Sequence, residues 1–175
     1  MLPPYVGDAT QSANMSPYQA TLVEIAGMFC ASDRRKEILR GLLEHRQRLN
    51  AIGFQGFQWL SGSFLEDIET LDGRPPRDVD VVTFFHKPAT ITDGAAWQAF
   101  INANLLVLDR GQVKAAFNVD VQFIDLDMPP AHVVSVARFW YGLFSHRRNG
   151  LWKGLLQLPL ALSADDDAAV LLVAP

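Results

Sequence analysis

The sequence predicts an α/β fold in which a small mixed β-sheet carries helices mainly on one of its faces. Three observations support this prediction. Apolar residues recur at helical spacing over residues 38–52, a β-branched and aromatic run covers residues 79–85, and apolar and polar residues alternate over residues 119–124. Because helical and strand patterns both occur within one chain, the predicted fold is mixed.

The composition is that of a globular protein with one core. The chain has 175 residues, of which 49% are hydrophobic and 19% are charged, so it is long enough to bury most of its apolar surface. We assign residues 16–175 to this single domain. Residues 1–15 contain turn formers and no apolar period, and we assign them to an extended N-terminal arm.

The charge and the cysteine content exclude several classes of protein. A formal net charge of −4 argues against strong binding of duplex nucleic acid, which needs a dominant basic surface. The single cysteine, Cys30, provides neither an internal disulfide nor a zinc cluster. The chain start lacks a secretory-signal pattern, and no apolar stretch approaches the roughly 20 residues that span a bilayer. We therefore expect a cytoplasmic protein without a membrane partner.

Two helices are expected before the first strand. For the first, Ser16-Pro17 places a capping side chain before a proline at the first helical position. The second begins after Ser32 or Asp33 and ends before Gly53. Both helices carry an apolar stripe that would face the sheet.

A buried strand is expected next, ended by the small residues Ser61-Gly62-Ser63. Residues 66–77 form a polar loop with strong turn chemistry, and a strand over residues 78–85 follows it. The remaining elements, in chain order, are a helix capped by Thr92 or Asp93, a strand at residues 119–124, a helix at residues 132–145 and a strand at residues 155–162 broken by Pro159.

Three aspartates form the candidate metal site. Side chains alternate along a strand, so Asp78 and Asp80 project from one face, and Asp120 joins them if the two strands lie side by side. Oxygen ligands of this kind suit Mg²⁺, or Mn²⁺, together with substrate phosphates. Two such ions can activate an attacking hydroxyl and neutralise a leaving pyrophosphate. We therefore take these three residues as candidate catalytic and metal-binding groups.

The Asp-x-Asp motif alone is weak evidence, because it occurs three times, at positions 78/80, 125/127 and 165/167. The first pair interrupts an apolar strand, where unpaired charge is costly. The second pair precedes Pro129-Pro130 and the third follows Ser163, so we interpret both as turn and cap residues. Position therefore singles out the pair at 78/80.

Small and basic residues supply candidate phosphate contacts. Glycine at Gly62 permits close approach of the backbone, and exposed N–H groups near Ser63 can bind phosphate, although a purely structural turn explains the dipeptide equally well. Lys153 near the end of the chain is a further candidate phosphate ligand. Basic residues after a helix are also common as a solvated end. We place Arg34 and Arg35 on the exposed first turn of the second helix.

The order of these features resembles the signature of the DNA polymerase β-like nucleotidyltransferase superfamily over residues 57–125: an apolar strand, Gly62-Ser63, a loop, Asp78-Val79-Asp80-Val81, and Asp120 in a later strand. The closest likeness is to small stand-alone bacterial members of the DUF6932 type. That narrower resemblance is carried by Leu2-Pro3-Pro4, Gly62-Ser63-Phe64-Leu65-Glu66, His146-Arg147-Arg148-Asn149-Gly150 and Lys153-Gly154.

The resemblance implies an enzyme that moves a nucleoside monophosphate from an NTP, such as ATP, to a hydroxyl acceptor with release of pyrophosphate. Gly62, Ser63 and Lys153 would hold the nucleotide, while Asp78 and Asp80 would bind both metals and Asp120 would complete the catalytic ion. The acceptor would be a protein, an RNA or a small molecule. A partner protein from the same operon, as in toxin–antitoxin or phage-defence systems, belongs to the same expectation.

Two other interpretations fit the same residues. The chain can be a non-catalytic nucleotide-binding or interaction module that keeps the nucleotidyltransferase fold, or a metal-dependent phosphohydrolase that releases inorganic phosphate. The loop between Ser63 and Asp78 is longer than the superfamily pattern usually has. We expect it to form a small excursion over the site.

Overall fold

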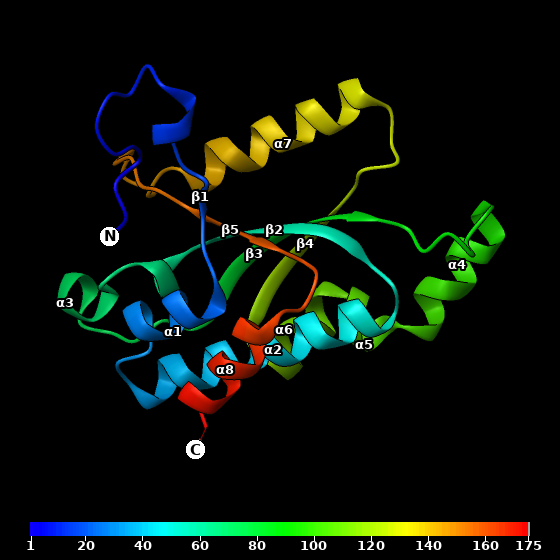
Figure 1. Cartoon of the computed structure of the whole chain (residues 1–175), viewed down its shortest axis with the longest axis horizontal. Helices are drawn as coiled ribbons and strands as arrows, with labels where there is room; N and C mark the ends of the chain where they lie inside the picture. Colours follow the sequence, from blue (N-terminus) through cyan, green and yellow to red (C-terminus); the bar gives the residue numbers. More distant parts are fainter. Residues whose placement is uncertain (175) are drawn as a thin grey trace.

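The computed structural model describes residues 1–174 and contains a five-stranded mixed sheet (Figure 1). Strand β2 is antiparallel to both of its neighbours, whereas the outer pairs β3–β4 and β1–β5 are parallel. The mixed α/β fold predicted from the sequence is confirmed. In spatial order the strands are β1 (Tyr18–Gln19), β5 (Leu156–Pro159), β2 (Gln55–Ser61), β3 (Val79–His86) and β4 (Val119–Asp125).

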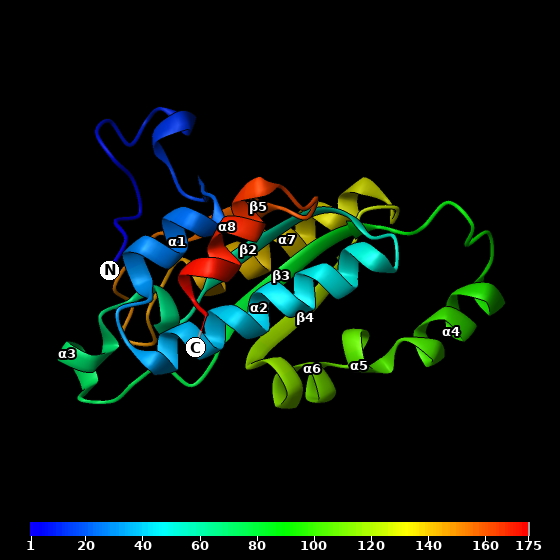
Figure 2. The same cartoon turned by 60° about the horizontal axis from the view of Figure 1, so that its bottom comes forward.

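The helices cover the two faces of the sheet unequally, as Figures 1 and 2 show. One face carries a single helix, α7 (Pro130–Phe144). The opposite face carries α1 (Leu22–Phe29), α2 (Asp33–Ala51), α5 (Leu105–Leu108), α6 (Arg110–Phe117) and α8 (Ala164–Leu172). The prediction that helices pack mainly on one face is therefore confirmed.

Helix α2 forms as its sequence predicts. The Ser32 hydroxyl accepts a hydrogen bond from the backbone N–H of Arg35, and Gly53 follows the helix with φ +87°. Its buried leucines and Ile38 face the sheet, each contributing about 1.5–3 kcal/mol by burial. This helix is the longest element in the described chain, and it contributes four buried side chains to the main hydrophobic core.

The start of the first helix was predicted wrongly. Ser16-Pro17 does not cap a helix but precedes the two-residue strand β1, whose edge pairs with β5. Helix α1 begins at Leu22, where Thr21 and Glu24 form a reciprocal capping box. The capping box satisfies the backbone N–H groups of Thr21 and Glu24, and the helix begins there.

Several further boundaries differ from the prediction. The loop over residues 66–77 contains the short helix α3 (Ile68–Asp72), because Ile68 is buried and Asp67 caps it. Strand β5 ends at Pro159 instead of continuing to residue 162. Helix α4 (Gly94–Ala103), capped by Asp93, extends away from the sheet at the end opposite α3 (Figure 1).

The N-terminal residues are not isolated from the domain. A β-bridge joins Tyr5 to Met15, the 3₁₀ helix η1 (Ser12–Asn14) lies between them, and Leu2 packs against the main core. Among residues 1–174, no helix is both long and apolar enough to cross a membrane.

A buried polar network joins α2 to the sheet and to α8. The guanidinium of Arg46, 1% exposed, donates to Gln58 Oε1 and to the carbonyl oxygen of Pro159, both at 2.9 Å, and lies 3.1 Å from Asp166 Oδ1. Asp166 is also the cap partner of Ser163, as its sequence position predicts. Such a pair is costly to break, since a lone buried charge remains.

Helices α2 and α6 touch at a glycine. A Cβ built at Gly41 would lie 1.8 Å from the carbonyl oxygen of Phe117, so only glycine permits this approach without a shift of α6. The position of α6 relative to the sheet is therefore fixed from the side of α2.

We predict that His45 makes the fold acid-sensitive. Burial lowers its pKa from 6.5 to about 4, and its Nε2 lies 3.0 Å from the carbonyl oxygen of Val107. Below pH 6.5 the unfolded chain binds a proton that the native state does not. Stability therefore falls as the pH drops towards 4, by about 3 kcal/mol in total from this residue.

Urea unfolding at several pH values between 4.5 and 7.5 measures this slope. His45→Gln should flatten it, whereas His132→Gln, on the exposed surface of α7, should keep the slope of the wild type. An unchanged slope in His45→Gln would contradict the assignment.

Candidate metal and nucleotide site

Three carboxylates gather where β3 and β4 begin and β2 ends. In the parallel pair β3–β4, Asp80 is opposite Asp120, and in the antiparallel pair β2–β3, Asp80 is opposite Ser61. Asp78 lies directly before β3. The side chains of Asp78 and Asp120 are only 17% and 11% exposed. The structure therefore brings together the carboxylate cluster (Asp78, Asp80 and Asp120) that the sequence predicts.

A turn before β4 aligns the two parallel strands. Asn118 ends α6 in the left-handed region, at φ +55°, and its carbonyl oxygen accepts a hydrogen bond from Val79 N at 3.1 Å. The guanidinium of Arg34 donates to Asn118 Oδ1 at 3.0 Å and also to the carbonyl oxygen of Arg77. Arg34 thus joins the segment before Asp78 to the segment before Asp120.

The Gly62 turn (Gly62 and the 3₁₀ helix η2, Ser63–Leu65) lies against the carboxylate cluster. Gly62 has φ +86°, and a Cβ built there would lie 2.1 Å from Asp80 Oδ2. The glycine is therefore required both by its backbone conformation and by the close approach of Asp80. Ser63 is the first residue of η2, so its backbone N–H belongs to a helix start.

Arg35 holds the Gly62 turn from the side of α2. This residue is buried, which corrects the prediction that it lies on an exposed first turn. Its guanidinium donates to the carbonyl oxygens of Phe64, at 2.7 Å, and Glu66, and forms two hydrogen bonds with the carboxylate of Glu69. The backbone carbonyls and the carboxylate of Glu69 thus provide hydrogen-bond acceptors and a counter-charge for this buried guanidinium.

Lys153 lies beside the Gly62 turn but is already paired. Its Nζ is 2.7 Å from Glu66 Oε1 and 3.5 Å from the carbonyl oxygen of Gly62, and the side chain is only 8% exposed. Arg147 Nε lies 2.9 Å from the other oxygen of Glu66. The predicted phosphate ligand Lys153 is therefore placed to support the turn, with Glu66 as its counter-ion.

Helix α6 supplies basic partners that face the cluster. Lys114 Nζ lies 2.6 Å from both Asp78 Oδ2 and Asp120 Oδ2. Arg110 binds Asp120 with two hydrogen bonds, Nε to Oδ1 at 2.6 Å and Nη2 to Oδ2 at 3.0 Å. The ammonium of Lys114 therefore bridges two of the three carboxylates.

The three carboxylates have different electrostatic environments. Burial, and then the charges of Asp78 and Asp120, raise the pKa of Asp80 to about 6. For Asp120, burial acts in the opposite direction to the hydrogen bonds from Arg110 and Lys114, but these outweigh it and lower the pKa. Asp80 is thus the carboxylate whose negative charge is least compensated by the protein.

The donor set suits a hard divalent cation. Three carboxylates supply oxygen ligands of the kind that Mg²⁺ and Mn²⁺ take, and Lys114 shows that a cation can contact Asp78 and Asp120 together. In the arrangement observed, however, no three His, Cys, Asp or Glu side chains among residues 1–174 form a group that could hold a metal. The oxygens of Asp78 and Asp120 are instead turned to α6.

Sequence reasoning missed the basic residues of the site. The spacing of Arg110 and Lys114, four positions apart just before the strand of Asp120, places both on one face of a helix. That spacing is a signal that could have found them. Glu66 and Arg35 gave no comparable signal, because their burial depends on contacts between distant parts of the chain.

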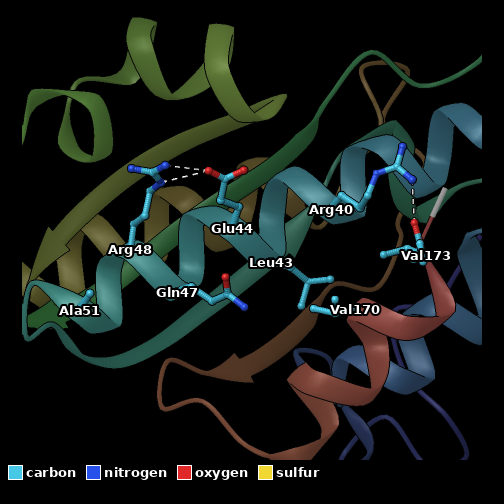
Figure 3. A pocket seen from close by; sticks show the side chains of 9 residues that line it. Arg40, Leu43, Glu44, Gln47, Arg48, Ala51, Val170 and Val173 are labelled. Carbon is cyan, nitrogen blue, oxygen red and sulfur yellow. Dashed lines mark hydrogen bonds and ion pairs between the residues drawn. The ribbon is translucent and has the colours of Figure 1, made fainter.

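A groove lies elsewhere, between α2 and α8 (Figure 3). It has a volume of about 670 Å³, and none of the three carboxylates lines it. Arg40 crosses one end of it and donates to the carbonyl oxygen of Val173, as Figure 3 shows. Arg48 pairs with Glu44 on the same helix.

Residues 1–159 match the model of DUF6932, a family of unknown function. The chain belongs to the DUF6932 family. No curated protein and no solved structure matches the chain. The Gly62 turn and the carboxylate cluster both lie within residues 1–159, which match the family model.

We predict that Gly62 is required because of Asp80. Gly62→Ala should destabilise this DUF6932 member by about 2–4 kcal/mol, because it adds a steric clash with the Asp80 carboxylate to the cost of a backbone conformation, φ +86° and ψ −172°, that is essentially restricted to glycine. Gly73 is the reference for a positive φ without a clash, since it lies in the left-handed helical region at φ +65° and ψ +24° and has open space at its Cβ position. Gly73→Ala should cost only about 1 kcal/mol.

Urea unfolding of a double-mutant cycle separates the two costs. In an Asp80→Ala background, Gly62→Ala should cost less than in the wild type, because the carboxylate that it meets is gone and only the backbone cost remains. Equal costs for Gly62→Ala with and without Asp80 would refute the predicted contact.

Proposed function

We propose that this chain is a nucleotidyltransferase of the DNA polymerase β-like superfamily. It transfers a nucleoside monophosphate from an NTP to a hydroxyl acceptor and releases pyrophosphate. The observation that carries the proposal is the strand register that sets Asp80 opposite Asp120 and against the Gly62 turn. Carboxylates and a phosphate-binding turn at one edge of a sheet are the parts that such a transfer needs.

The residues have separate roles in this proposal. The carboxylate cluster holds Mg²⁺ or Mn²⁺, which supplies charge stabilisation for the phosphoryl oxygens and for the leaving pyrophosphate. The Gly62 turn offers backbone N–H groups to the phosphates, and Ser63 adds a hydroxyl. Lys153 and Glu66 hold the Gly62 turn in place through their ion pair and the contact of Lys153 with the carbonyl oxygen of Gly62. Asp120 lies in the strand next to Asp80 and assists the acceptor hydroxyl.

One observation favours a second candidate, a non-catalytic nucleotide-binding module. Lys114 and Arg110 already occupy the oxygens of Asp78 and Asp120, and a permanent ion pair of this kind would exclude a metal. The two candidates differ in one measurable product, since only the transferase releases pyrophosphate.

We predict that the purified protein, incubated with each α-labelled NTP, Mn²⁺ or Mg²⁺ and pools of protein, RNA or small-molecule acceptors, transfers label and releases pyrophosphate. Asp78→Asn/Asp80→Asn should reduce this activity at least about 100-fold, because the charge stabilisation is lost. Label on the acceptor and pyrophosphate in solution are the two measurements.

The third Asp-x-Asp pair provides the matched control. Asp165→Asn/Asp167→Asn removes two exposed carboxylates of α8 and should leave the activity intact. Release of inorganic phosphate would assign a phosphohydrolase instead. NTP binding without any product would assign the non-catalytic module.

A further inference from the structure

The carboxylate cluster is closed by two basic side chains of one helix. Lys114 bridges Asp78 and Asp120 through contacts of 2.6 Å, and Arg110 forms a bidentate pair with Asp120. Both basic residues project from α6, whose first turn is capped by Asp109. A divalent cation at these oxygens would compete with both side chains for the same lone pairs and would repel their positive charges.

We propose that Lys114 and Arg110 are the internal counter-ions of the metal-free site, which a divalent cation displaces and which then bind the triphosphate of the nucleotide. This inference rests on the proposed function. It adds two residues to the nucleotide site and assigns them different partners before and after the metal binds.

Charge balance in the site requires some such compensation. Three carboxylates within one buried edge repel one another, and the raised pKa of Asp80 reflects this repulsion in part. The two cations of α6 reduce the charge of the cluster from −3 to −1 while no metal is bound. Two divalent cations and a triphosphate, about −4 in charge, return the site to −3. Cations near the phosphates then become necessary.

The mobility of the two side chains permits the exchange. Lys114 and Arg110 are 48% and 62% exposed, whereas Asp78 and Asp120 are 17% and 11% exposed. Long exposed side chains change rotamer within nanoseconds. The helix itself is held against α2 at Gly41, so the released cations stay beside the site.

Lys153 and Arg147 are not available for this role. Glu66 lies 2.7 Å from Lys153 Nζ and 2.9 Å from Arg147 Nε, and Lys153 is buried. Glu66 and, for Arg147, Asp72 Oδ1 at 3.6 Å supply the counter-charges of these two side chains within the support of the Gly62 turn. Among the basic side chains that contact the site, those of α6 are therefore the ones that can be released.

Lys114→Met tests both the metal-free and the metal-bound state of the site, because it should raise the affinity for Mn²⁺ and lower the affinity for the nucleotide. Without the competing ammonium, Mn²⁺ should bind about tenfold more tightly. At saturating Mn²⁺, a non-hydrolysable α,β-methylene NTP should bind about tenfold more weakly, because one phosphate ligand is lost. Calorimetry measures both affinities. The metal-free variant should also have a lower Tm, which Mn²⁺ restores.

Two variants control for charge and for structure. Lys114→Arg keeps the cation and should remain within about threefold of the wild type for both ligands. Arg138→Met removes one positive charge from the exposed surface of α7, on the face of the sheet opposite α6, and should change neither affinity. A role of Lys114 in stability alone predicts no split between Mn²⁺ and nucleotide.

The inference is overturned if Lys114→Met changes both affinities in the same direction or changes neither, or if no variant binds Mn²⁺. Its failure is distinguishable from failure of the proposed function. A split in affinities without pyrophosphate release would keep the displacement and reject the transferase. Pyrophosphate release without a split would do the reverse.

Discussion

Repulsion among three carboxylates is the constraint on which the site depends. The parallel register sets Asp80 opposite Asp120 on neighbouring strands. Like charges that are paired in this way, at a partly buried edge of the sheet, oppose folding unless cations compensate them. The chain meets the constraint by placing α6 directly before β4, so that Lys114 reaches Asp78 and Asp120 together. The strand order, the α6–β4 connection and the basic residues of α6 therefore form one solution to one electrostatic problem.

The first turn of α2 connects this problem to the rest of the fold. Arg34 joins the segments that precede β3 and β4, while Arg35 holds the carbonyl oxygens of the turn that follows β2. Two consecutive residues thus fix all three strand ends at which the site is built. Their guanidinium groups have several fixed donors each, which is why arginine rather than lysine suits both positions.

The sequence predicts the local parts of the site better than its supports. Strand alternation and the interruption of an apolar run were enough to select Asp78 and Asp80, and the helix signals around Ser32 and Gly53 predicted α2. The burial of Arg35 and Glu66 could not be predicted, because it depends on backbone carbonyls and charges more than 25 positions away. The two-residue strand β1 was missed for the same reason, since its only signal is a partner strand near the other end of the chain.

The packing of α6 makes the state of the site depend on the core behind it. Gly41 lets the end of α6 approach α2 so closely that the carbonyl oxygen of Phe117 fills the space of a side chain. The next residue, Asn118, then takes a left-handed conformation and begins the ladder that aligns Asp80 with Asp120. A side chain as small as a methyl group at Gly41 would therefore shift α6. That shift would move Lys114 and Arg110 and would disturb the register between β3 and β4. The place of Lys114 beside the carboxylates and the register that sets Asp80 opposite Asp120 therefore depend on the same helix contact.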